Sequence, residues 1–276
     1  MHESKRRSLL YLPGSSQRMM EKAGSRGADV LVLDLEDGVH PDAKSEARDR
    51  VADALRRLDW GGSEVFVRVN GDNTPWSGAD IEMVRDARPA GVVLPKCEEP
   101  QKVGAVAARL APTPLFLMVE TAWGVVAAPE LARAKGVAGL VFGAADYRES
   151  LRAGRLPEEL ELLYARSCIL NAARAAGIDA FDTPWFEYKD LEGLRASALR
   201  VRGMGFDGKT AIHPGQVAVI QDVFSPSPAE VDRARAIVDV MEKALANGHN
   251  VAVLGDEMVE ALHMKQARRI LARAGS

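Results

Sequence analysis

The 276-residue sequence has little of what would mark a secreted, membrane-bound or disulfide-rich protein. Its two cysteines, Cys97 and Cys168, are too few for a disulfide scaffold, so we expect two reduced, buried thiols. No apolar stretch is as long as a membrane-spanning helix. The basic residues near the N-terminus precede no long apolar segment, so no signal peptide is predicted. These absences favour a cytoplasmic protein.

The sequence also has no large excess of charge of one sign. A net charge of -3 gives no electrostatic reason to expect a nucleic-acid partner. The hydrophobic content of 47% and charged content of 27% are typical of a globular protein with a sizeable core. The length suits one α/β barrel or two small domains.

Eight short apolar runs recur along the chain, each about as long as a β-strand. They are rich in Val, Leu, Ile and Phe and mostly do not alternate with polar residues, as in strands buried on both faces of a parallel sheet. They cover residues 8–14, 29–37, 64–70, 91–96, 114–120, 139–143, 179–185 and 208–214. Helices are predicted between them, over residues 17–25, 42–58, 77–87, 100–110, 124–135, 158–176 and 190–204. The alternation predicts an α/β fold, a TIM (β/α)8 barrel, with an open doubly wound sheet as the alternative.

The chain continues after the eighth unit. The stretch FSPSP, residues 224–228, interrupts the pattern and precedes two amphipathic helices, predicted over residues 229–247 and 257–274 with a glycine-containing loop between them. We therefore divide the chain into a barrel over residues 1–224 and a C-terminal helical extension over residues 225–276. The extension is expected to pack on the outside of the barrel or on a neighbouring subunit.

Two of the apolar runs end in a carboxylate: Glu120 in LFLMVET and Asp146 in LVFGAAD. An unpaired buried charge is costly, so we expect both side chains to face water, a cation or a ligand at the end of a strand. The carboxyl ends of barrel strands are the face that carries chemistry. Either residue alone is also a reasonable helix cap. As a pair without a neighbouring His or Cys, they suit Mg²⁺ or Mn²⁺ rather than zinc.

Arg68 lies inside an apolar run and needs either a carboxylate partner or an anionic ligand. The acidic segment DLED offers Glu36 and Asp37 as partners. Both interpretations stay open at this point.

Other charged residues near strand ends also have two interpretations. Lys96 suits a metal-free Schiff-base aldolase, or is one surface lysine among many. Arg18 and Lys22 follow the first run, where they either bind phosphate or are solvated helix charges. Asp182 lies near the end of the seventh run, and His213, in the eighth, is interpreted as a structural hydrogen-bonding residue.

The motifs together resemble a known family, the citrate lyase beta subunit and its relatives. These relatives include malyl-CoA, citramalyl-CoA and β-methylmalyl-CoA lyases and, more distantly, metal-dependent 2-oxoacid aldolases. The resemblance spans residues 7–268 and is carried by LYLPGSSQRMMEKA, VLDLEDGV, FVRVNG, VVLPK, VETAWGV, VFGAADY, GFDGKTAIHPGQ and VFSPSPAEVDRA.

The resemblance implies a TIM barrel that assembles as a trimer or a multiple of it. It implies that Glu120 and Asp146 bind Mg²⁺ and substrate, and that Arg68 meets the substrate carbonyl or enolate oxygen. Arg18 and Lys22 match positions near the CoA arm.

The acidic segment and the C-terminal segment complete the implied catalytic set. Glu36 and Asp37 match the positions nearest to the water shell of the metal. The family carries a catalytic Asp in a segment resembling G-x-M-[IV]-D, donated across the subunit interface. Here the segment reads GDEMVE, which puts Glu260 at that position. A Glu can still act as a general acid or base, although its extra methylene moves the carboxyl group by roughly 1.5 Å.

We therefore expect an Mg²⁺-dependent carbon–carbon lyase that cleaves citryl-CoA or a related hydroxyacyl thioester to an acyl thioester and a 2-oxoacid such as oxaloacetate. The carrier is CoA or an acyl-carrier protein, and neither a nucleic acid nor a membrane is expected as a partner. The alternatives are a malyl- or citramalyl-CoA lyase, a malate-synthase-like enzyme, a Schiff-base aldolase using Lys96, and a non-catalytic acyl-CoA-binding subunit.

Overall fold

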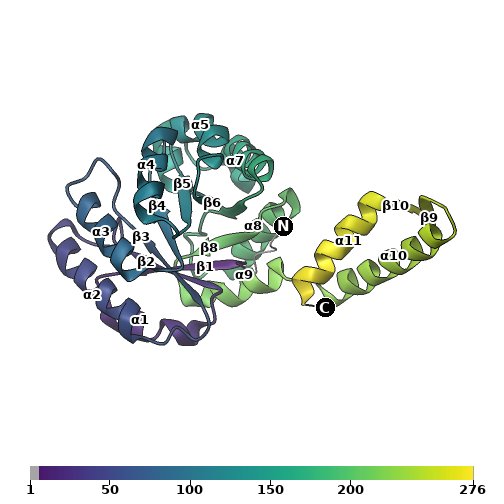
Figure 1. The fold of residues 1–276 in the computed structure, drawn as a ribbon, viewed down its shortest axis with the longest axis horizontal. Helices are drawn as coiled ribbons and strands as arrows, with labels where there is room; N and C mark the ends of the chain where they lie inside the picture. The colour runs from purple at the N-terminus through teal and green to yellow at the C-terminus, as the bar shows by residue number, and fades with distance from the viewer. Residues whose placement is uncertain (1–5, 276) are drawn as a thin grey trace. The chain divides into compact units, whose positions relative to one another are not determined.

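The computed structural model describes residues 6–275 and contains two compact units, one over Arg6–Gln221 and one that begins at Asp222. The first is a closed barrel of eight parallel strands surrounded by helices (Figure 1). This confirms the predicted TIM barrel. The expectation about a signal peptide falls largely on residues 1–5, which lie outside the described residues.

The eight predicted strands are all present, and all except β6, which starts two residues earlier than predicted, are shorter than their apolar runs. Each strand pairs with the next in sequence, and β8 closes the barrel by pairing with β1. Their bounds are β1 Ser8–Pro13, β2 Val30–Asp34, β3 Glu64–Arg68, β4 Gly91–Leu94, β5 Leu115–Val119, β6 Val137–Phe142, β7 Asp179–Asp182 and β8 Gly208–Ala211.

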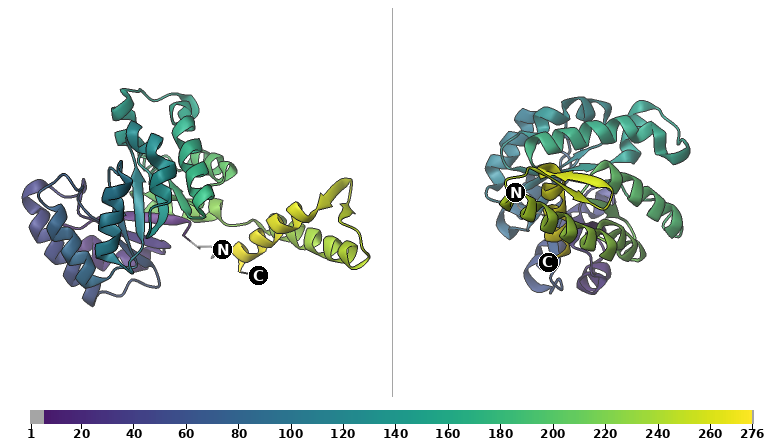
Figure 2. Two further views of the ribbon diagram at one scale, coloured as in Figure 1. Left: turned by 45° about the horizontal axis from the view of Figure 1, so that its top comes forward. Right: turned by 90° about the vertical axis from the view of Figure 1, so that its right-hand side faces the viewer.

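Nine α-helices and four 3-10 turns follow or join these strands within the described residues, and the helices lie around the barrel (Figure 2). The helices are α1 Gln17–Glu21, α2 Lys44–Arg57, α3 Ser77–Ala87, α4 Pro100–Leu110, α5 Ala122–Ala132, α6 Ala144–Leu151, α7 Leu163–Ala176, α8 Leu191–Met204 and α9 Val217–Phe224. The turns are η1 Ala23–Arg26, η2 Pro41–Ala43, η3 Pro157–Leu162 and η4 Pro214–Gln216.

Two details of the helix prediction are wrong. The predicted helix over residues 158–176 is interrupted, because Glu158 and Glu159 have φ angles of 58° and 57°, and α7 begins only at Leu163. Helices α6 and α9 were not predicted: β6 ends at Phe142 and α6 starts at Ala144, and α9 follows the eighth strand.

Alternate residues of the strands point into the barrel, because successive side chains of a strand lie on opposite faces. The inner core contains Leu9, Val30, Val32, Phe66, Val93, Phe116, Met118, Val141 and Phe181. The same alternation, continued toward the carboxyl ends, reaches Tyr11, Asp34, Arg68 and Glu120. The barrel interior therefore changes from apolar to charged along its axis.

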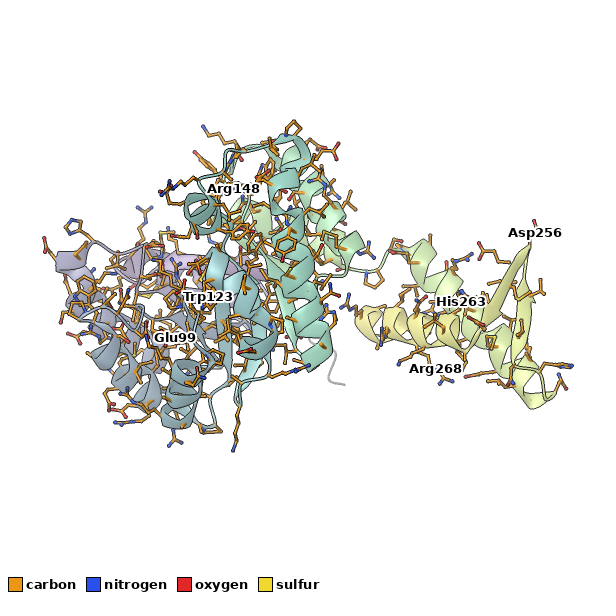
Figure 3. The ribbon with its side chains drawn as sticks, turned by 90° about the horizontal axis from the view of Figure 1, so that it is seen from above. Glu99, Trp123, Arg148, Asp256, His263 and Arg268 are labelled. Atoms are coloured by element: carbon orange, nitrogen blue, oxygen red, sulfur yellow. The ribbon has the colours of Figure 1, made fainter. Side chains whose placement is uncertain are left out.

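The C-terminal unit contains α10 Pro228–Ala246, β9 Val251–Leu254, β10 Glu257–Glu260 and α11 Ala261–Ala274. The two helices lie side by side, and β9 and β10 form an antiparallel hairpin with Asp256 at its turn (Figure 3). The glycine-containing loop was predicted to lead into a helix that starts at residue 257. Instead, β9 and β10 form a hairpin, and α11 starts at Ala261. In the described part of the chain, no helix has both the length and the apolar character that crossing a membrane requires.

Candidate active site

A cavity lies at the carboxyl ends of the barrel strands and collects residues that are far apart in the sequence. The charged residues in its wall include four of the predicted site residues, Arg68, Glu120, Asp146 and Asp37, together with Asp34. Strands β2, β3 and β5, the loop after β2 and helix α6 supply them. This is the face of a barrel on which active sites are found.

Glu120 follows β5 directly and is almost completely buried, with 1% of its surface exposed. Its Oε1 accepts a hydrogen bond of 2.7 Å from the Lys96 backbone N–H. Burial, and then the negative charge of Glu36, raise the pKa of Glu120 to about 8. No Lys or Arg side chain within residues 6–275 forms an ion pair with it. Glu120 is therefore a buried carboxylate without an ion-pair partner among the described residues, and the charge of Arg68 only partly offsets the rise in its pKa.

Asp146 stands in the first turn of α6, not at the end of β6 as its sequence context suggested. It is half-buried, lines the same cavity, and its charge contributes to the raised pKa of Glu120. Gly143, between β6 and α6, makes room for this arrangement. A Cβ atom at Gly143 would come within 2.4 Å of Glu120 Oε2 and within 2.6 Å of Glu120 Cβ. The glycine is thus required by the close approach of the Glu120 side chain.

Arg68 is buried at the end of β3 and is held mainly by Asp34. Its Nε and Nη2 donate hydrogen bonds of 2.7 and 2.6 Å to the two carboxylate oxygens of Asp34. Its Nη1 lies 2.9 Å from Glu36 Oε2 and 3.7 Å from Asp37 Oδ2. Burial opposes the charged form, but Asp34 more than compensates and raises the pKa of Arg68. The guanidinium is therefore a fixed, permanent cation in the cavity wall.

Sequence reasoning named Glu36 and Asp37 as the partners of Arg68 and passed over Asp34. The signal that identifies Asp34 is the register: Val30, Val32 and Asp34 alternate inward, and Asp34 is the direct neighbour of Arg68 across β2 and β3. Glu36 does bind Arg68, whereas the half-exposed Asp37 is the more distant of the three carboxylates.

Lys96 connects the carboxylates on either side of it. Its Nζ lies 2.9 Å from Glu36 Oε1, and its backbone adopts a positive φ of 51°, which directs its N–H to Glu120. Burial alone would lower the pKa of Lys96, but the hydrogen bond and charge of Glu36 raise it. A Schiff-base lysine needs a free amine, and hence a lowered pKa. This geometry opposes the metal-free aldolase alternative.

The remaining predicted site residues do not line this cavity. Arg18, on α1, and Lys22, at its C-terminal end, are exposed, and in the described chain neither side chain has an ion-pair partner. Both are free to meet an anionic ligand. Glu260 ends β10 in the C-terminal unit, is exposed, and donates its backbone N–H to His263 Nδ1 at 3.1 Å. Its role remains a prediction.

The sequence and the fold were compared with known proteins. The family model described as HpcH/HpaI aldolase/citrate lyase matches residues 7–214. The chain belongs to this family. A second model, a carbon–carbon bond lyase of the TIM-barrel fold, matches residues 172–276, so the C-terminal unit is also covered.

The relatives of this family member include enzymes with different names. A (3S)-malyl-CoA thioesterase of Cereibacter sphaeroides is 41% identical over 97% of this chain and 94% of its own length. The citrate lyase beta subunit of Escherichia coli K12 is 36% identical over 98% of this chain and 93% of its own length. The CitE protein of Mycobacterium tuberculosis, crystallised with magnesium, acetoacetate and coenzyme A, has a TM-score of 0.83 at 31% identity, over 98% of both chains.

Lys44 supports the acidic segment of this family member and was missed by sequence reasoning. It is 6% exposed, and its Nζ donates to the carbonyl oxygens of Leu35 and Glu36 and to Asn70 Oδ1 at 2.6–2.9 Å. Burial lowers the pKa of Lys44. It fixes the loop after β2, and so the position of Glu36. The sequence around Lys44 does not indicate this role, because its contacts with the loop after β2 depend on how α2 packs on the barrel.

Asp182, expected at the mouth, is instead part of a buried ion network outside the barrel. It is fully buried between Lys209 Nζ at 2.5 Å and Arg166 Nε at 2.8 Å. Burial would raise the pKa of Asp182, but the charges of Lys209 and Arg166 lower it. Since Phe181 points into the barrel, Asp182 points outward.

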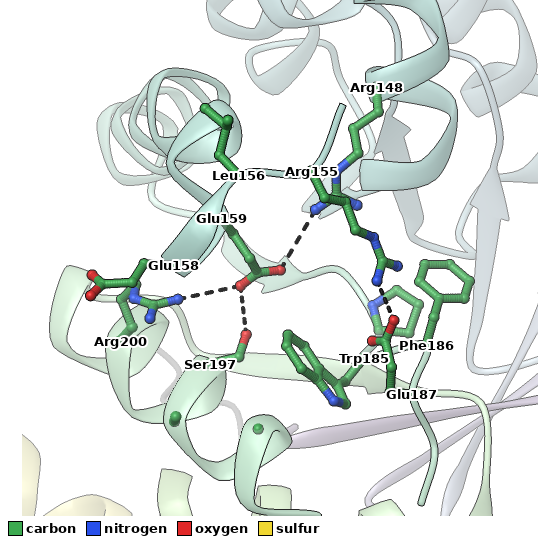
Figure 4. A pocket seen from close by; sticks show the side chains of 13 residues that line it. Arg148, Arg155, Leu156, Glu158, Glu159, Trp185, Phe186, Glu187, Ser197 and Arg200 are labelled. Carbon is green, nitrogen blue, oxygen red and sulfur yellow. Dashed lines mark hydrogen bonds and ion pairs between the residues drawn. The ribbon is translucent and has the colours of Figure 1, made fainter. Parts of the chain in front are cut away.

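The network extends to Glu159, which lies in the wall of a second pocket (Figure 4). Its carboxylate accepts from Ser197 Oγ at 2.9 Å and pairs with Arg166, with Arg200 at 3.5 Å and with Arg148 at 3.9 Å. Because these charged side chains pair with one another, we interpret their role in the pocket wall as structural. His213 is likewise structural, since its Nδ1 accepts from the Gly215 N–H.

Proposed function

We propose that this protein is an Mg²⁺-dependent carbon–carbon lyase that cleaves a hydroxyacyl-CoA thioester, citryl-CoA or a related ester such as malyl-CoA. The observation that carries the proposal is the pair Glu120 and Asp146 in one cavity with Arg68. The pair offers oxygen donors and leaves positions open for water or substrate, as Mg²⁺ sites do. Related M. tuberculosis proteins were crystallised with magnesium, acetoacetate and coenzyme A, and with oxaloacetate and magnesium, which supports the same assignment.

Mg²⁺ held by Glu120 and Asp146 would supply a Lewis acid for the oxygens of a 2-oxoacid. The bond that breaks joins the hydroxyl-bearing carbon to the carbon beside the thioester carbonyl. The hydroxyl oxygen becomes the carbonyl oxygen of the 2-oxoacid, and its proton leaves. The electron pair passes to the acyl thioester, which takes up a proton. Arg68, fixed by Asp34, stabilises negative charge on a substrate oxygen as the bond breaks.

Glu36 and Asp37 differ in their contacts, and we assign them different roles. Glu36 is engaged by both Arg68 and Lys96, so it serves to hold these cations. Asp37 is half-exposed and lines the cavity, so it is better placed to hold a water or move a proton. Arg18 and Lys22, which are exposed and form no ion pair with another described residue, are proposed to contact the phosphates of CoA or of an acyl carrier.

Hydrolysis of the thioester is the second candidate, because the (3S)-malyl-CoA thioesterase relatives are up to 41% identical to this chain. The two reactions leave different products. A lyase releases a 2-oxoacid and keeps the thioester bond, whereas a thioesterase releases free CoA thiol. An assay of malyl-, citramalyl- and citryl-CoA should follow the 2-oxoacid with phenylhydrazine and the thiol with a disulfide reagent.

The variants Glu120→Ala and Asp146→Ala test the metal role. Each should abolish Mg²⁺-dependent formation of the 2-oxoacid, and should prevent Mg²⁺ from raising the melting temperature. Glu130→Ala, at an exposed carboxylate of α5, is the matched control. Turnover at the wild-type rate in either site variant would remove the metal assignment. Binding of acyl-CoA by the wild type without any turnover would indicate a non-catalytic binding subunit.

We also propose that the protein is a homo-oligomer in which Glu260 serves a neighbouring subunit. On the hairpin, Val251, Val253, Met258 and Glu260 share one face, because Val251 pairs with Glu260 and Val253 with Met258. The three apolar side chains are 43–71% exposed, while Ala252 and Val259 on the other face are buried. An exposed apolar face favours contact with another protein surface, and Glu260 lies on this face.

Mixing two inactive variants tests this arrangement. Glu260→Ala lacks the proposed proton carrier, and Glu120→Ala lacks the metal ligand. If Glu260 acts across an interface, then unfolding and refolding the two variants together should restore part of the lyase activity, because some sites combine an intact Glu120 with an intact Glu260. Full activity of Glu260→Ala alone, or a monomeric mass by light scattering, would contradict the proposal.

A further inference from the structure

Tyr11 stands in the active-site cavity with a hydroxyl group that has no partner. It lies on β1, lines the cavity with Arg68 and Glu120, and its ring rests on the inner barrel core. The Tyr11 Oη atom is inaccessible to solvent and forms no hydrogen bond with any other described residue. A buried hydroxyl without a hydrogen bond is costly, and such groups are rare in native proteins. The hydroxyl therefore needs an explanation.

The Tyr11 ring lies among the charged residues of the cavity. The guanidinium carbon of Arg68 lies 5.3 Å from the centroid of the Tyr11 ring, so the ring and the cation lie against each other. The negative charges of Asp34, Glu120 and Glu36 also act on the phenol. Burial and these carboxylates raise the pKa of Tyr11, so the group stays protonated and can donate.

The carboxylates around Tyr11 are already committed to other donors. Asp34 binds Arg68 through both oxygens and also accepts the backbone N–H groups of Glu36 and Gly38. Glu120 Oε1 binds the Lys96 N–H. Glu36 Oε2 lies 2.9 Å from Arg68 Nη1, and neither it nor Glu120 Oε2 accepts a hydrogen bond from the Tyr11 hydroxyl, which has no partner among the described residues. An oxygen of a bound ligand would supply the acceptor.

We propose that the Tyr11 hydroxyl donates a hydrogen bond to an oxygen of the bound 2-oxoacid portion of the substrate, and so makes Tyr11 a specificity-determining residue. This rests on the proposed lyase function. Its physical basis is that a pocket with an unpaired donor favours ligands that bring an acceptor and disfavours apolar groups at the same place. Tyr11 on β1 and Arg68 on β3, two strands that are separated by β2, would then meet the same ligand.

The variant Tyr11→Phe tests the inference, because it removes one oxygen atom and keeps the ring. Binding of oxaloacetate in the presence of Mg²⁺, measured by calorimetry, should weaken about 10-fold or more, and kcat/KM for the best hydroxyacyl-CoA should fall about 10- to 100-fold. The dissociation constant for Mg²⁺ alone should stay within about twofold of the wild type, since the ligands are untouched. Tyr164→Phe, on the exposed surface of α7, is the control and should change none of these values.

The melting temperature of the ligand-free protein provides an independent readout. Tyr11→Phe should leave it unchanged or raise it, because the variant removes a buried donor that has no partner in the free protein. A clear fall would mean that the hydroxyl is already satisfied, for example by a buried water, and would overturn the inference. Wild-type oxaloacetate affinity in Tyr11→Phe would overturn it as well. Failure of the wild type itself to bind any of oxaloacetate, glyoxylate and pyruvate, the 2-oxoacids that cleavage of citryl-, malyl- and citramalyl-CoA releases, would instead refute the proposed function.

Discussion

Neutralising Glu120 should stabilise the metal-free protein, and the gain should grow with pH. The pKa of Glu120 is raised from the ordinary value of 4.5 to about 8 by burial and by Glu36. The folded state therefore holds a proton that the unfolded state releases. Its contribution to stability is fully present below pH 4.5 and is lost as the pH rises through 8. Glu120→Gln keeps an acceptor for the Lys96 N–H and has no proton to lose.

The size of the effect follows from the two pKa values. With 1.36 kcal/mol per pKa unit, the penalty for wild-type Glu120 is roughly 1 kcal/mol at pH 5 and roughly 4 kcal/mol at pH 8. The free energy of unfolding of Glu120→Gln should exceed that of the wild type by a margin that grows by about 3 kcal/mol over this range. For a domain of this size, that corresponds to roughly 6–12 °C in melting temperature.

The assay is thermal unfolding of both proteins, followed by calorimetry in EDTA at several values of pH between 5 and 8. Glu130→Gln, at an exposed position on α5, is the control and should follow the wild type. Added Mg²⁺ should then reverse the order at pH 8, raising the melting temperature of the wild type but not of Glu120→Gln. A difference between the two proteins that does not change with pH would refute the electrostatic reasoning.

Two further predictions concern packing and buried charge. Gly143→Ala should weaken Mg²⁺ binding at least about tenfold, because the new Cβ would displace the Glu120 side chain, whereas Gly154→Ala, where a Cβ meets nothing within 4 Å, should bind Mg²⁺ as the wild type does. Lys209→Met should lower the free energy of unfolding by about 3 kcal/mol, because Asp182 loses one of its two buried cations. Lys243→Met, which breaks an exposed ion pair with Asp239, should leave the free energy of unfolding, measured by chemical denaturation, almost unchanged.

The barrel could be predicted from the sequence because each strand is buried on both faces and therefore reads as a continuous apolar run. Because these runs are apolar on both faces, they do not indicate which residues point into the barrel. Asp182 and Glu120 both end such runs, yet Asp182 faces the helical layer with Lys209, and Glu120 faces the cavity. Only the register of neighbouring strands distinguishes the two positions, and register is not visible in one run taken alone.

The short elements were missed for a different reason. Helix α6 follows β6 after a single residue, Gly143, which has no side chain to cap the helix. The sequence LVFGAA therefore contains no signal for a helix start, and its apolar residues are typical of a strand. The hairpin of β9 and β10 has four residues in each strand and one exposed face, which makes its pattern too short to distinguish from a loop. Both elements carry candidate site residues, Asp146 and Glu260.

The buried carboxylates of the barrel unit differ in how their charges are balanced. Asp182 has Lys209 and Arg166, and Asp34 has Arg68, so each of these carboxylates is balanced by a side chain of the protein. Glu120 is as deeply buried, but its neighbours Glu36 and Asp146 are negative, and its bond to Lys96 comes from a neutral N–H. A buried carboxylate must either keep its proton or meet a positive charge. At neutral pH, the Mg²⁺ ion that we propose Glu120 shares with Asp146 would supply this positive charge.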